Sequence, residues 1–377
     1  MGYRKGTFER NSETVFDFFL CEKKIEKNIG RKKNCKMVNS ALHLCPRTHT
    51  LHSHACPSHH TRSSPPQSDD EPLIDASQYL SSSWHEAAVS YTQRDLLTYA
   101  VGIGCDELRY VWELDCDFAA FPTYPIVLEF KGTSHDVVSF PSPTMMESPV
   151  MAMPPLPGTR VILDGERYIE KLSELDESGC ECILKSKLVG VHARRSGASI
   201  EMESLLTEAA TGKPLYRFLS SSFMVGAKGF TGAGKEHFAA VKPPKGVAPD
   251  AVEEIATAAN QTALYRLSGD YNPLHVDPEF AQMSGFAEPI LHGLCSLGVS
   301  ARAVLRRFGE NDASQFRAIK VRFSKPVLPG QTLRVEMWRA DGPMGKGTRI
   351  IFRTLVKETG KVCITNAFCD LNGAAKL

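Results

Sequence analysis

The sequence predicts an α+β protein in which one unit, a helix followed by antiparallel strands, occurs twice. One observation is the amphipathic segment His292–Phe308, which four segments with strand-like alternation follow. A second is a shared turn sequence, because Ala210–Lys213 and Glu358–Lys361 both contain Thr-Gly-Lys between predicted strands. A third is Gly226–Pro249, a stretch rich in Gly, Lys and Pro that is typical of a linker between two folded halves.

The first half contains a helix, a loop and several strands by these criteria. Arg94–Val101 predicts a short helix, because Leu96, Leu97 and Ala100 recur at helical spacing. Residues 132–158 are rich in Pro, Met and Ser and predict a long loop. Strand-like segments follow at Arg160–Leu163, Ser199–Glu203 and Tyr216–Val225.

The second half has the clearer pattern. His292–Phe308 places its apolar residues on one stripe, and Arg306 and Arg307 lie near its C-terminus, where cations oppose the helix dipole. Ile319–Ser324 and Leu333–Met337 alternate apolar and polar residues, as half-buried strands do. The remaining strand candidates are Ile350–Lys357 and Val362–Phe368, which flank the second Thr-Gly-Lys turn.

Composition and charge narrow the class of protein. The chain has 377 residues with 42% hydrophobic and 23% charged residues, which favours a globular protein with a sizeable core. The net charge of +1 combines about +7 in residues 1–62 with about −6 in the remainder, so the body does not suggest a nucleic-acid partner. No run of 18 apolar residues predicts a membrane span. Eleven irregularly spaced cysteines indicate a reducing compartment instead of a disulfide scaffold.

Residues 1–78 are predicted to be a basic, disordered leader, because their polar and Ser/Pro-rich stretches offer little to bury. Eight His and Cys residues between His43 and His60 raise the possibility of a zinc site. No paired Cys-x2-Cys spacing accompanies them, so no metal is predicted.

Two apparent phosphate-binding motifs are unconvincing. Gly229–Glu236 resembles a P-loop, but Glu236 stands where a Ser or Thr would hold Mg²⁺, and a carboxylate there would repel phosphate. Gly102-Ile103-Gly104 lacks the third glycine and the strand-before-helix setting of a dinucleotide site. The sequence therefore predicts no nucleotide cofactor.

The segment Tyr265–Pro278 carries the clearest chemical signal. Asp270 and His275 are five residues apart, and Gly269 and Pro273 argue against a regular helix, so the chain can bring carboxylate and imidazole together. Such a pair could hold one water and exchange protons near neutral pH. The alternative is an Asx-turn in which Asp270 binds local amides, and on spacing alone that structural interpretation is the stronger one.

The downstream sequence favours the catalytic interpretation. His292-Gly293-Leu294 leads directly into the predicted long helix, whose N-terminal amides are free to donate at the positive end of the dipole. Gly293 would let a ligand approach the backbone closely. A pair that handles water and an amide that binds an oxyanion are the parts needed to add water across a carbonyl-activated double bond.

Three segments closely resemble one family, the peroxisomal (R)-specific 2-enoyl-CoA hydratases, also called hydratase 2 or MaoC-like hydratases. The segments are Tyr265–Pro278, Ile290–Leu294 and Phe323–Gly330, and the resemblance extends over roughly residues 85–372. It implies a tandem (double) hot-dog fold, each half a long helix wrapped by an antiparallel β-sheet, in agreement with the repeat. The resemblance divides the chain into five parts. Residues 1–78 would be the leader, residues 79–228 a non-catalytic hot-dog that accommodates the acyl chain, and residues 229–249 a linker. Residues 250–374 would be the catalytic hot-dog, and residues 375–377 the targeting tripeptide.

The resemblance also implies the roles of individual residues. Asp270 and His275 would be the catalytic pair, Asn272 would position the water or product hydroxyl, and the Gly293 N–H would hold the thioester oxygen. Further substrate contacts would fall at Tyr271, Pro273, Leu274 and Phe323, and in the first half at Asp164, Gly165 and Arg194. Relatives often have His in place of Asp164 and Lys near the place of Arg194. A guanidinium can still meet a CoA phosphate, whereas Asp164 would have to use its backbone.

The implied reaction adds water to a trans-2-enoyl-CoA and yields a (3R)-3-hydroxyacyl-CoA, with no metal or redox cofactor. Asp270 is the favoured base and His275 the favoured acid, although two titrating groups that share one water are coupled. The alternatives are an acyl-thioester dehydratase of fatty-acid or polyketide synthesis and a non-catalytic acyl-CoA-binding protein. The last of these would be expected to have lost Asp270 or His275.

The C-terminal tripeptide Ala375-Lys376-Leu377 is a close variant of the Ser-Lys-Leu peroxisomal address. It predicts recognition by the peroxisomal import receptor and a role in peroxisomal fatty-acid β-oxidation. The family resemblance further implies a homodimer.

Overall fold

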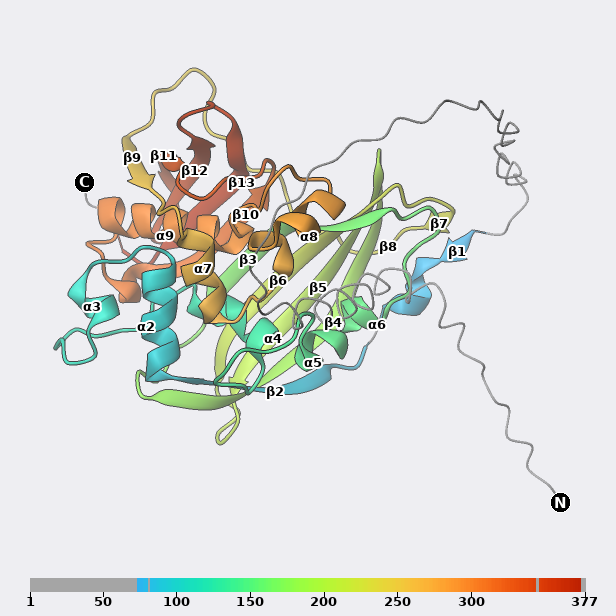
Figure 1. Cartoon of the computed structure of the whole chain (residues 1–377), viewed down its shortest axis with the longest axis horizontal. Helices are drawn as coiled ribbons and strands as arrows, with labels where there is room; N and C mark the ends of the chain where they lie inside the picture. The colour runs from blue at the N-terminus through green and yellow to red at the C-terminus, as the bar shows by residue number, and fades with distance from the viewer. Residues whose placement is uncertain (1–72, 81, 344–345, 374–377) are drawn as a thin grey trace, which may run out of the picture. The chain divides into compact units, whose positions relative to one another are not determined.

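The computed structural model describes residues 73–80, 82–343 and 346–373 (Figure 1). Most of the predicted leader and the whole targeting tripeptide lie outside these residues. The described residues all lie in one compact unit. None of the helices in the described part of the chain is long and apolar enough to cross a membrane.

The first half begins with a strand and a helix and ends with four long strands. Two short elements precede it, β1 (Ile74–Asp75) and the 3-10 helix η1 (Ala76–Tyr79). Its strands are β2 (His85–Thr92), β3 (Val161–Lys171), β4 (Gly179–Arg194), β5 (Gly197–Glu208) and β6 (Pro214–Val225). Its helices are α2 (Gln93–Gly102), α3 (Leu108–Val111), η2 (Tyr124–Val127), α4 (Leu128–Lys131), α5 (Pro143–Met146) and α6 (Pro149–Ala152).

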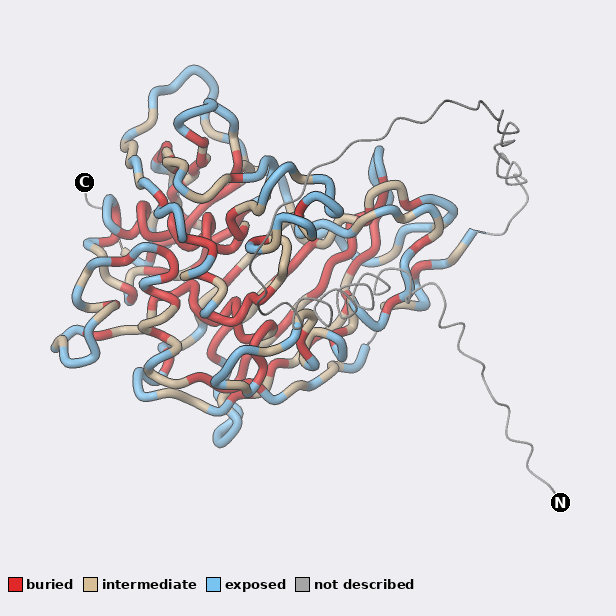
Figure 2. Tube along the Cα trace, viewed as in Figure 1, coloured by how far each residue is buried: buried red, intermediate tan, exposed pale blue. Residues whose placement is uncertain are grey.

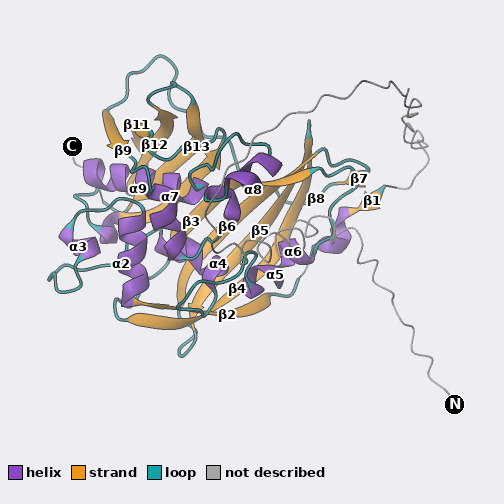
Figure 3. Cartoon of the chain, in the orientation of Figure 1, coloured by secondary structure: helices purple, strands orange, loops and turns teal. Residues whose placement is uncertain are grey.

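The second half repeats this order after the short strands β7 (Phe230–Thr231) and β8 (Ala233–Gly234). Its strands are β9 (Ala251–Ala256), β10 (Phe316–Phe323), β11 (Thr332–Asp341), β12 (Thr348–Val356) and β13 (Val362–Leu371). Its helices are α7 (Gln261–Tyr265), η3 (Arg266–Ser268), η4 (Pro273–His275), α8 (Pro278–Met283), α9 (Gly293–Phe308) and η5 (Ala313–Gln315). Figure 3 shows the helices gathered along one side of the strands.

The strand order confirms the tandem α+β repeat. The main sheet runs β2-β4-β5-β6-β3-β10-β13-β12-β11-β9, and β8 pairs with β4 at its side. The order of the first half is therefore mirrored by that of the second, with β3 and β10 antiparallel at the junction. Two copies of one unit joined edge to edge give this arrangement, and the pairing covers one edge strand of each copy.

The central helix differs between the halves. In the second half α9 spans 16 residues, and all but three are buried (Figure 2). The helix packs on the sheet strands, and its Cys295 and Gly298 contact the end of α2 at Gly102 and Ile103. In the first half, between β2 and β3, the chain forms the ten-residue α2 and several single-turn helices, η2 and α4 among them, and none of these helices reaches the length of α9. The first half thus departs from the expected long helix, and its face of the sheet is covered by short segments.

Several local predictions differ from the structure. The predicted loop at 132–158 contains the single-turn helices α5 and α6, each of which begins with a proline at its first position. The predicted linker begins with β7 and β8, and β7 pairs in parallel with β1. The sequence patterns missed β2, β4 and β9, although β4 is the longest strand among the described residues.

Candidate active site

Asp270 and His275 are brought together by a short irregular segment. The chain leaves α7 and η3, turns at Gly269, whose φ of 131° a residue with a side chain rarely adopts, and enters η4. One carboxylate oxygen of Asp270 and one ring nitrogen of His275 lie within 4.8 Å of each other. The spacing of five residues therefore places both groups in reach of one small molecule.

Asp270 is buried, with 6% of the residue's surface exposed. Burial disfavours the charged form and raises its pKa to about 6. The Asn272 N–H donates to Oδ1 at 3.3 Å and opposes this effect, as does the nearby Arg167, while Asp164 and Glu129 raise the pKa further. The carboxyl can therefore gain and lose a proton close to neutral pH.

His275 is held as a neutral imidazole. Its Nδ1 donates to the Ile290 carbonyl oxygen at 2.8 Å, so Nε2 carries the lone pair. Burial lowers the pKa of His275 to about 4, and the hydrogen bond to Ile290 only partly offsets this. At neutral pH the ring can accept a proton or a hydrogen bond at Nε2 but has no proton there to donate.

His292 is a member of the site to which the sequence interpretation gave no role. Its ring stacks on His275 with 3.7 Å between centroids and 28° between planes, and its Nε2 donates to the Asp270 carbonyl at 3.2 Å. Burial and the neighbouring His275 keep its pKa well below the usual value. His292 therefore fixes both the position of His275 and the backbone of Asp270.

The three residues Asp270, His275 and His292 offer ligand atoms within 4.8 Å of one another, so a metal must be considered. A metal ion binds imidazole along the nitrogen lone pair, which lies in the ring plane. Two rings that stack at 3.7 Å cannot both direct a lone pair at one ion without leaving their planes. The arrangement fits proton transfer better than metal binding.

Gly293 stands at the first position of α9, where the N–H has no acceptor within the helix. A Cβ at this position would lie 3.2 Å from the Phe323 ring, so glycine leaves a gap between the start of the helix and that ring. Asn272 caps η4, because its Oδ1 accepts the Leu274 N–H at 3.0 Å. Asn272 thus lies between the two members of the acid–base pair in the chain, while Gly293 follows His292, which stacks on His275, and faces the Phe323 ring.

Two predicted contacts of the first half lie on β3, where a β-bulge changes the facing of the chain. Asp164 pairs with Ser222 and Glu166 with Ser221, so Gly165 is the extra residue. The bulge places Asp164 on the same face as Arg167, whose Nε donates to both carboxylate oxygens at 3.0 Å. Asp164 is therefore held by an ion pair that the sequence interpretation did not foresee.

The remaining residues predicted to contact the substrate lie around the Asp270–His275 pair or farther from it. Arg194 ends β4 and forms an ion pair with Glu236 at 2.7 Å. Tyr271 is buried, and the Arg266 guanidinium lies 4.9 Å from its ring centroid. Pro273 and Leu274 form η4 and are half-buried. These residues surround the pair or lie at the end of the first-half sheet, and their contacts with a substrate remain predictions.

A buried acid–base pair beside a helix N-terminus, on a double hot-dog fold, defines a class of protein that can move protons on a carbonyl-activated substrate. Comparison with known families agrees with this class. Residues 89–226 match the MFE-2 hydratase 2 N-terminal domain, and residues 241–365 match the MaoC like domain. The chain belongs to the MaoC-like hydratase 2 family.

Individual relatives support this assignment. The chain is 41% identical over 305 residues to the peroxisomal multifunctional enzyme type 2 of Drosophila melanogaster. The matched region covers 78% of this chain and 48% of that protein. The chain is 32% identical to the peroxisomal enoyl-CoA hydratase 2 of Arabidopsis thaliana, covering 76% of this chain and 92% of that one. A crystal structure of a MaoC-like dehydratase from Phytophthora capsici superposes with a TM-score of 0.71 at 39% identity, covering 80% of this chain and all of that one.

The match to the multifunctional relatives is partial. The chain spans about half the length of the Drosophila protein, so only the part of that enzyme that it resembles bears on its activity. The Arabidopsis and Phytophthora proteins, in contrast, are matched over nearly their whole length.

Proposed function

We propose that this protein is a (3R)-specific enoyl-CoA hydratase 2, a hydro-lyase that adds water reversibly to trans-2-enoyl-CoA. The observation that carries the proposal is the buried Asp270–His275 pair, with one nitrogen of His275 free to bind water beside the N-terminus of α9. The names of the Drosophila and Arabidopsis relatives support the same reaction.

In the proposed reaction, one water donates hydrogen bonds to the Asp270 carboxylate and to His275 Nε2. Asp270 accepts a proton from the water as the oxygen attacks C3, because its pKa of about 6 makes it the stronger base of the two. The Gly293 N–H stabilises the enolate oxygen of the thioester. The proton on Asp270 then passes to C2, so that H and OH from one water are added.

These protonation states refine the roles predicted from the sequence. The interpretation of Asp270 as the base agrees with an ionised carboxylate at neutral pH. His275, expected to be the acid, is neutral and carries its proton on Nδ1, which the Ile290 carbonyl occupies. We therefore assign His275 the task of orienting the water, and Asp270 both proton transfers.

The substrate would enter along the second-half segments and extend towards the first half. Phe323 and Gly293 flank the position proposed for the thioester, while Tyr271, Pro273 and Leu274 form the neighbouring wall. Arg194 would meet a CoA phosphate after release from Glu236, and Asp164 and Gly165 would contact the ligand from β3. The first half would accommodate the acyl chain.

We further propose that the enzyme acts in peroxisomal β-oxidation as a homodimer. The name of the Arabidopsis relative and the tripeptide Ala375-Lys376-Leu377 support the compartment. Fusion of a fluorescent protein to the N-terminus, with and without the last three residues, tests recognition by the import receptor. Sedimentation of the purified chain tests the dimer.

The reaction is tested by the loss of enoyl-thioester absorbance with crotonyl-CoA and trans-2-decenoyl-CoA, and the product by a (3R)-specific dehydrogenase. Asp270→Asn should abolish hydration, and His275→Ala should lower kcat/KM at least about 100-fold. A folded wild-type protein that hydrates neither substrate would contradict the proposal. Activity on acyl-carrier substrates would then favour a dehydratase of synthesis, the same chemistry in reverse, and binding without turnover would favour an acyl-CoA-binding protein.

A further inference from the structure

A small cavity lies in the first half, on the face of the sheet where the long helix is missing. Its wall is mainly apolar and includes Ile126, Leu184, Met202 and Phe218. The cavity has a volume of about 20 Å³. That is room for about one water, so the cavity as it stands admits no acyl chain.

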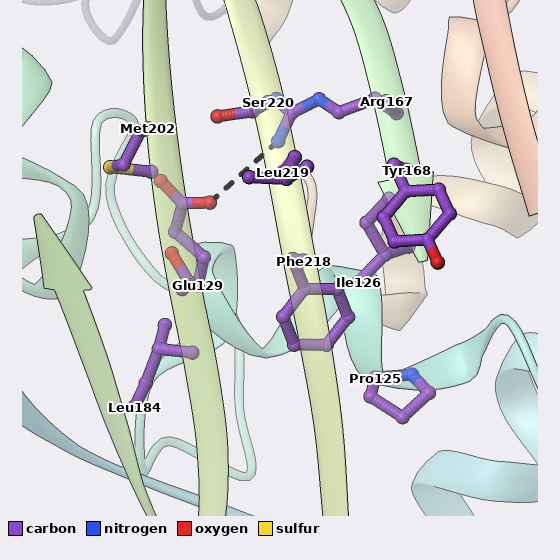
Figure 4. Close-up of a pocket in the computed structure, with 11 residues that line it drawn as sticks. Pro125, Ile126, Glu129, Arg167, Tyr168, Leu184, Met202, Phe218, Leu219 and Ser220 are labelled. Atoms are coloured by element: carbon purple, nitrogen blue, oxygen red, sulfur yellow. Dashed lines mark ion pairs between the residues drawn. The ribbon is translucent and has the colours of Figure 1, made fainter. Parts of the chain in front are cut away.

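A charged pair lies in this apolar wall. Figure 4 shows the Glu129 carboxylate of α4 pointing at the Arg167 guanidinium of β3, and Oε2 and Nη1 are 3.9 Å apart. The side chains are only 21% and 14% exposed, and burial raises the pKa of Glu129. Arg167 is also anchored by its two hydrogen bonds to Asp164, so Glu129 is the more movable partner.

The pair lies next to the proposed reaction site. Arg167 is the cross-strand partner of Val321 on β10, two residues before Phe323, and it shares the sheet face of Ser220 in the cavity. Arg167 lowers the pKa of the Asp270 carboxyl and Glu129 raises it, so both side chains lie within electrostatic reach of that group. An acyl chain that continues from C3 along β3 into the first half would therefore meet this pair.

We propose that the Glu129–Arg167 ion pair closes the acyl pocket and limits the enzyme to short-chain trans-2-enoyl-CoA substrates. The inference rests on the proposed hydratase function. A longer chain has to separate a buried carboxylate from its guanidinium and leave the carboxylate against apolar side chains, which is unfavourable. Burial of the added methylene groups offsets only part of that cost.

The test compares Glu129→Ala, which opens the cavity, with Glu129→Gln, which keeps the volume and removes the charge. Values of kcat/KM are measured for crotonyl-CoA, trans-2-hexenoyl-CoA and trans-2-decenoyl-CoA. We expect the wild type to prefer crotonyl-CoA, and the decenoyl-to-crotonyl ratio to rise about tenfold in Glu129→Ala, as burial of about two further methylene groups would give. Glu129→Gln should raise the ratio less.

The matched control is Glu203→Ala. Glu203 pairs with Arg217 at 2.7 Å and follows Met202 on β5, so it faces the opposite side of the sheet from the cavity. Its ratio should equal that of the wild type. Circular dichroism establishes that each variant is folded.

Calorimetry with butyryl-CoA and decanoyl-CoA repeats the comparison without turnover, and decanoyl-CoA binding should strengthen about tenfold in Glu129→Ala. Unchanged ratios in both measurements would overturn the inference while leaving the hydratase function intact. If the wild type hydrates nothing but the affinity ratio still shifts, the reaction is wrong and the pocket closure stands. A wild type that prefers decenoyl-CoA would overturn the closure directly.

Discussion

Replacement of Asp270 by Asn should abolish activity and stabilise the fold. The folded protein holds this carboxyl with a pKa of about 6, against an ordinary value of 3.8, because burial disfavours its charge. Folding therefore favours the protonated carboxyl. The loss of free energy of unfolding caused by the buried charge is absent below pH 3.8 and complete above pH 6. The difference of about two pH units corresponds to about 3 kcal/mol at pH 7.5.

The dependence on pH makes this prediction specific. The same linkage gives a gain for Asp270→Asn of about 3 kcal/mol at pH 7.5 that falls to about half of that at pH 5. Urea unfolding of wild type and variant at both pH values measures the difference in free energy of unfolding. Asp341→Asn, at an exposed position at the end of β11, provides the control and should show little change.

Two results would refute the reasoning. If Asp270→Asn is less stable than the wild type at pH 7.5, the buried carboxylate is not a strained group of the folded state. If the difference is the same at pH 5 and pH 7.5, the pKa of Asp270 is close to its ordinary value. Either result would remove the physical basis for Asp270 as a base that works near neutral pH.

Three further predictions concern activity and packing. Between pH 7 and pH 5, kcat/KM for crotonyl-CoA should fall about tenfold as Asp270 is protonated, and a flat profile would contradict this assignment. His275→Ala should lower kcat/KM at least about 100-fold without changing the circular dichroism spectrum, whereas near-normal rates would exclude His275 from the reaction. Gly298→Val should lower the free energy of unfolding, measured in urea, by about 1–3 kcal/mol, because a Cβ there would lie 2.5 Å from an Ile103 methyl carbon. Unchanged stability would show that the segment after α2 moves aside at no cost.

The predicted elements of the second half agree closely with the structure because their patterns are local. The segment His292–Phe308 has an apolar stripe, and the structure forms α9 over Gly293–Phe308. The strand β4, in contrast, was missed, since its buried positions include Cys182 and Ser186 and therefore lack the regular alternation of apolar and polar residues that predicts a strand. Its stability comes from pairing with β2 and β5 across long sequence separations.

The candidate site divides in the same way. The proximity of Asp270 and His275 follows from a turn within one short segment, so the sequence could predict it. The stacking of His292 on His275 depends on how η4 packs against the start of α9, and the influence of Arg167 on Asp270 depends on segments far apart in the chain. A polar residue in β3 gives no sign, by itself, that it will face a cavity.

By itself the sequence determined the kinds of group available for chemistry and the local turns and helix ends that carry them: Asp270, His275 and the Gly293 amide. The tertiary structure decided how these groups behave. Burial moves the pKa of Asp270 up and that of His275 down, and the pairing of β3 with β10 joins the strand that carries Arg167 to the second half. The physical reason is that a pKa and a pocket depend on the charges and the solvent exclusion of everything within several ångströms, whatever its distance along the chain.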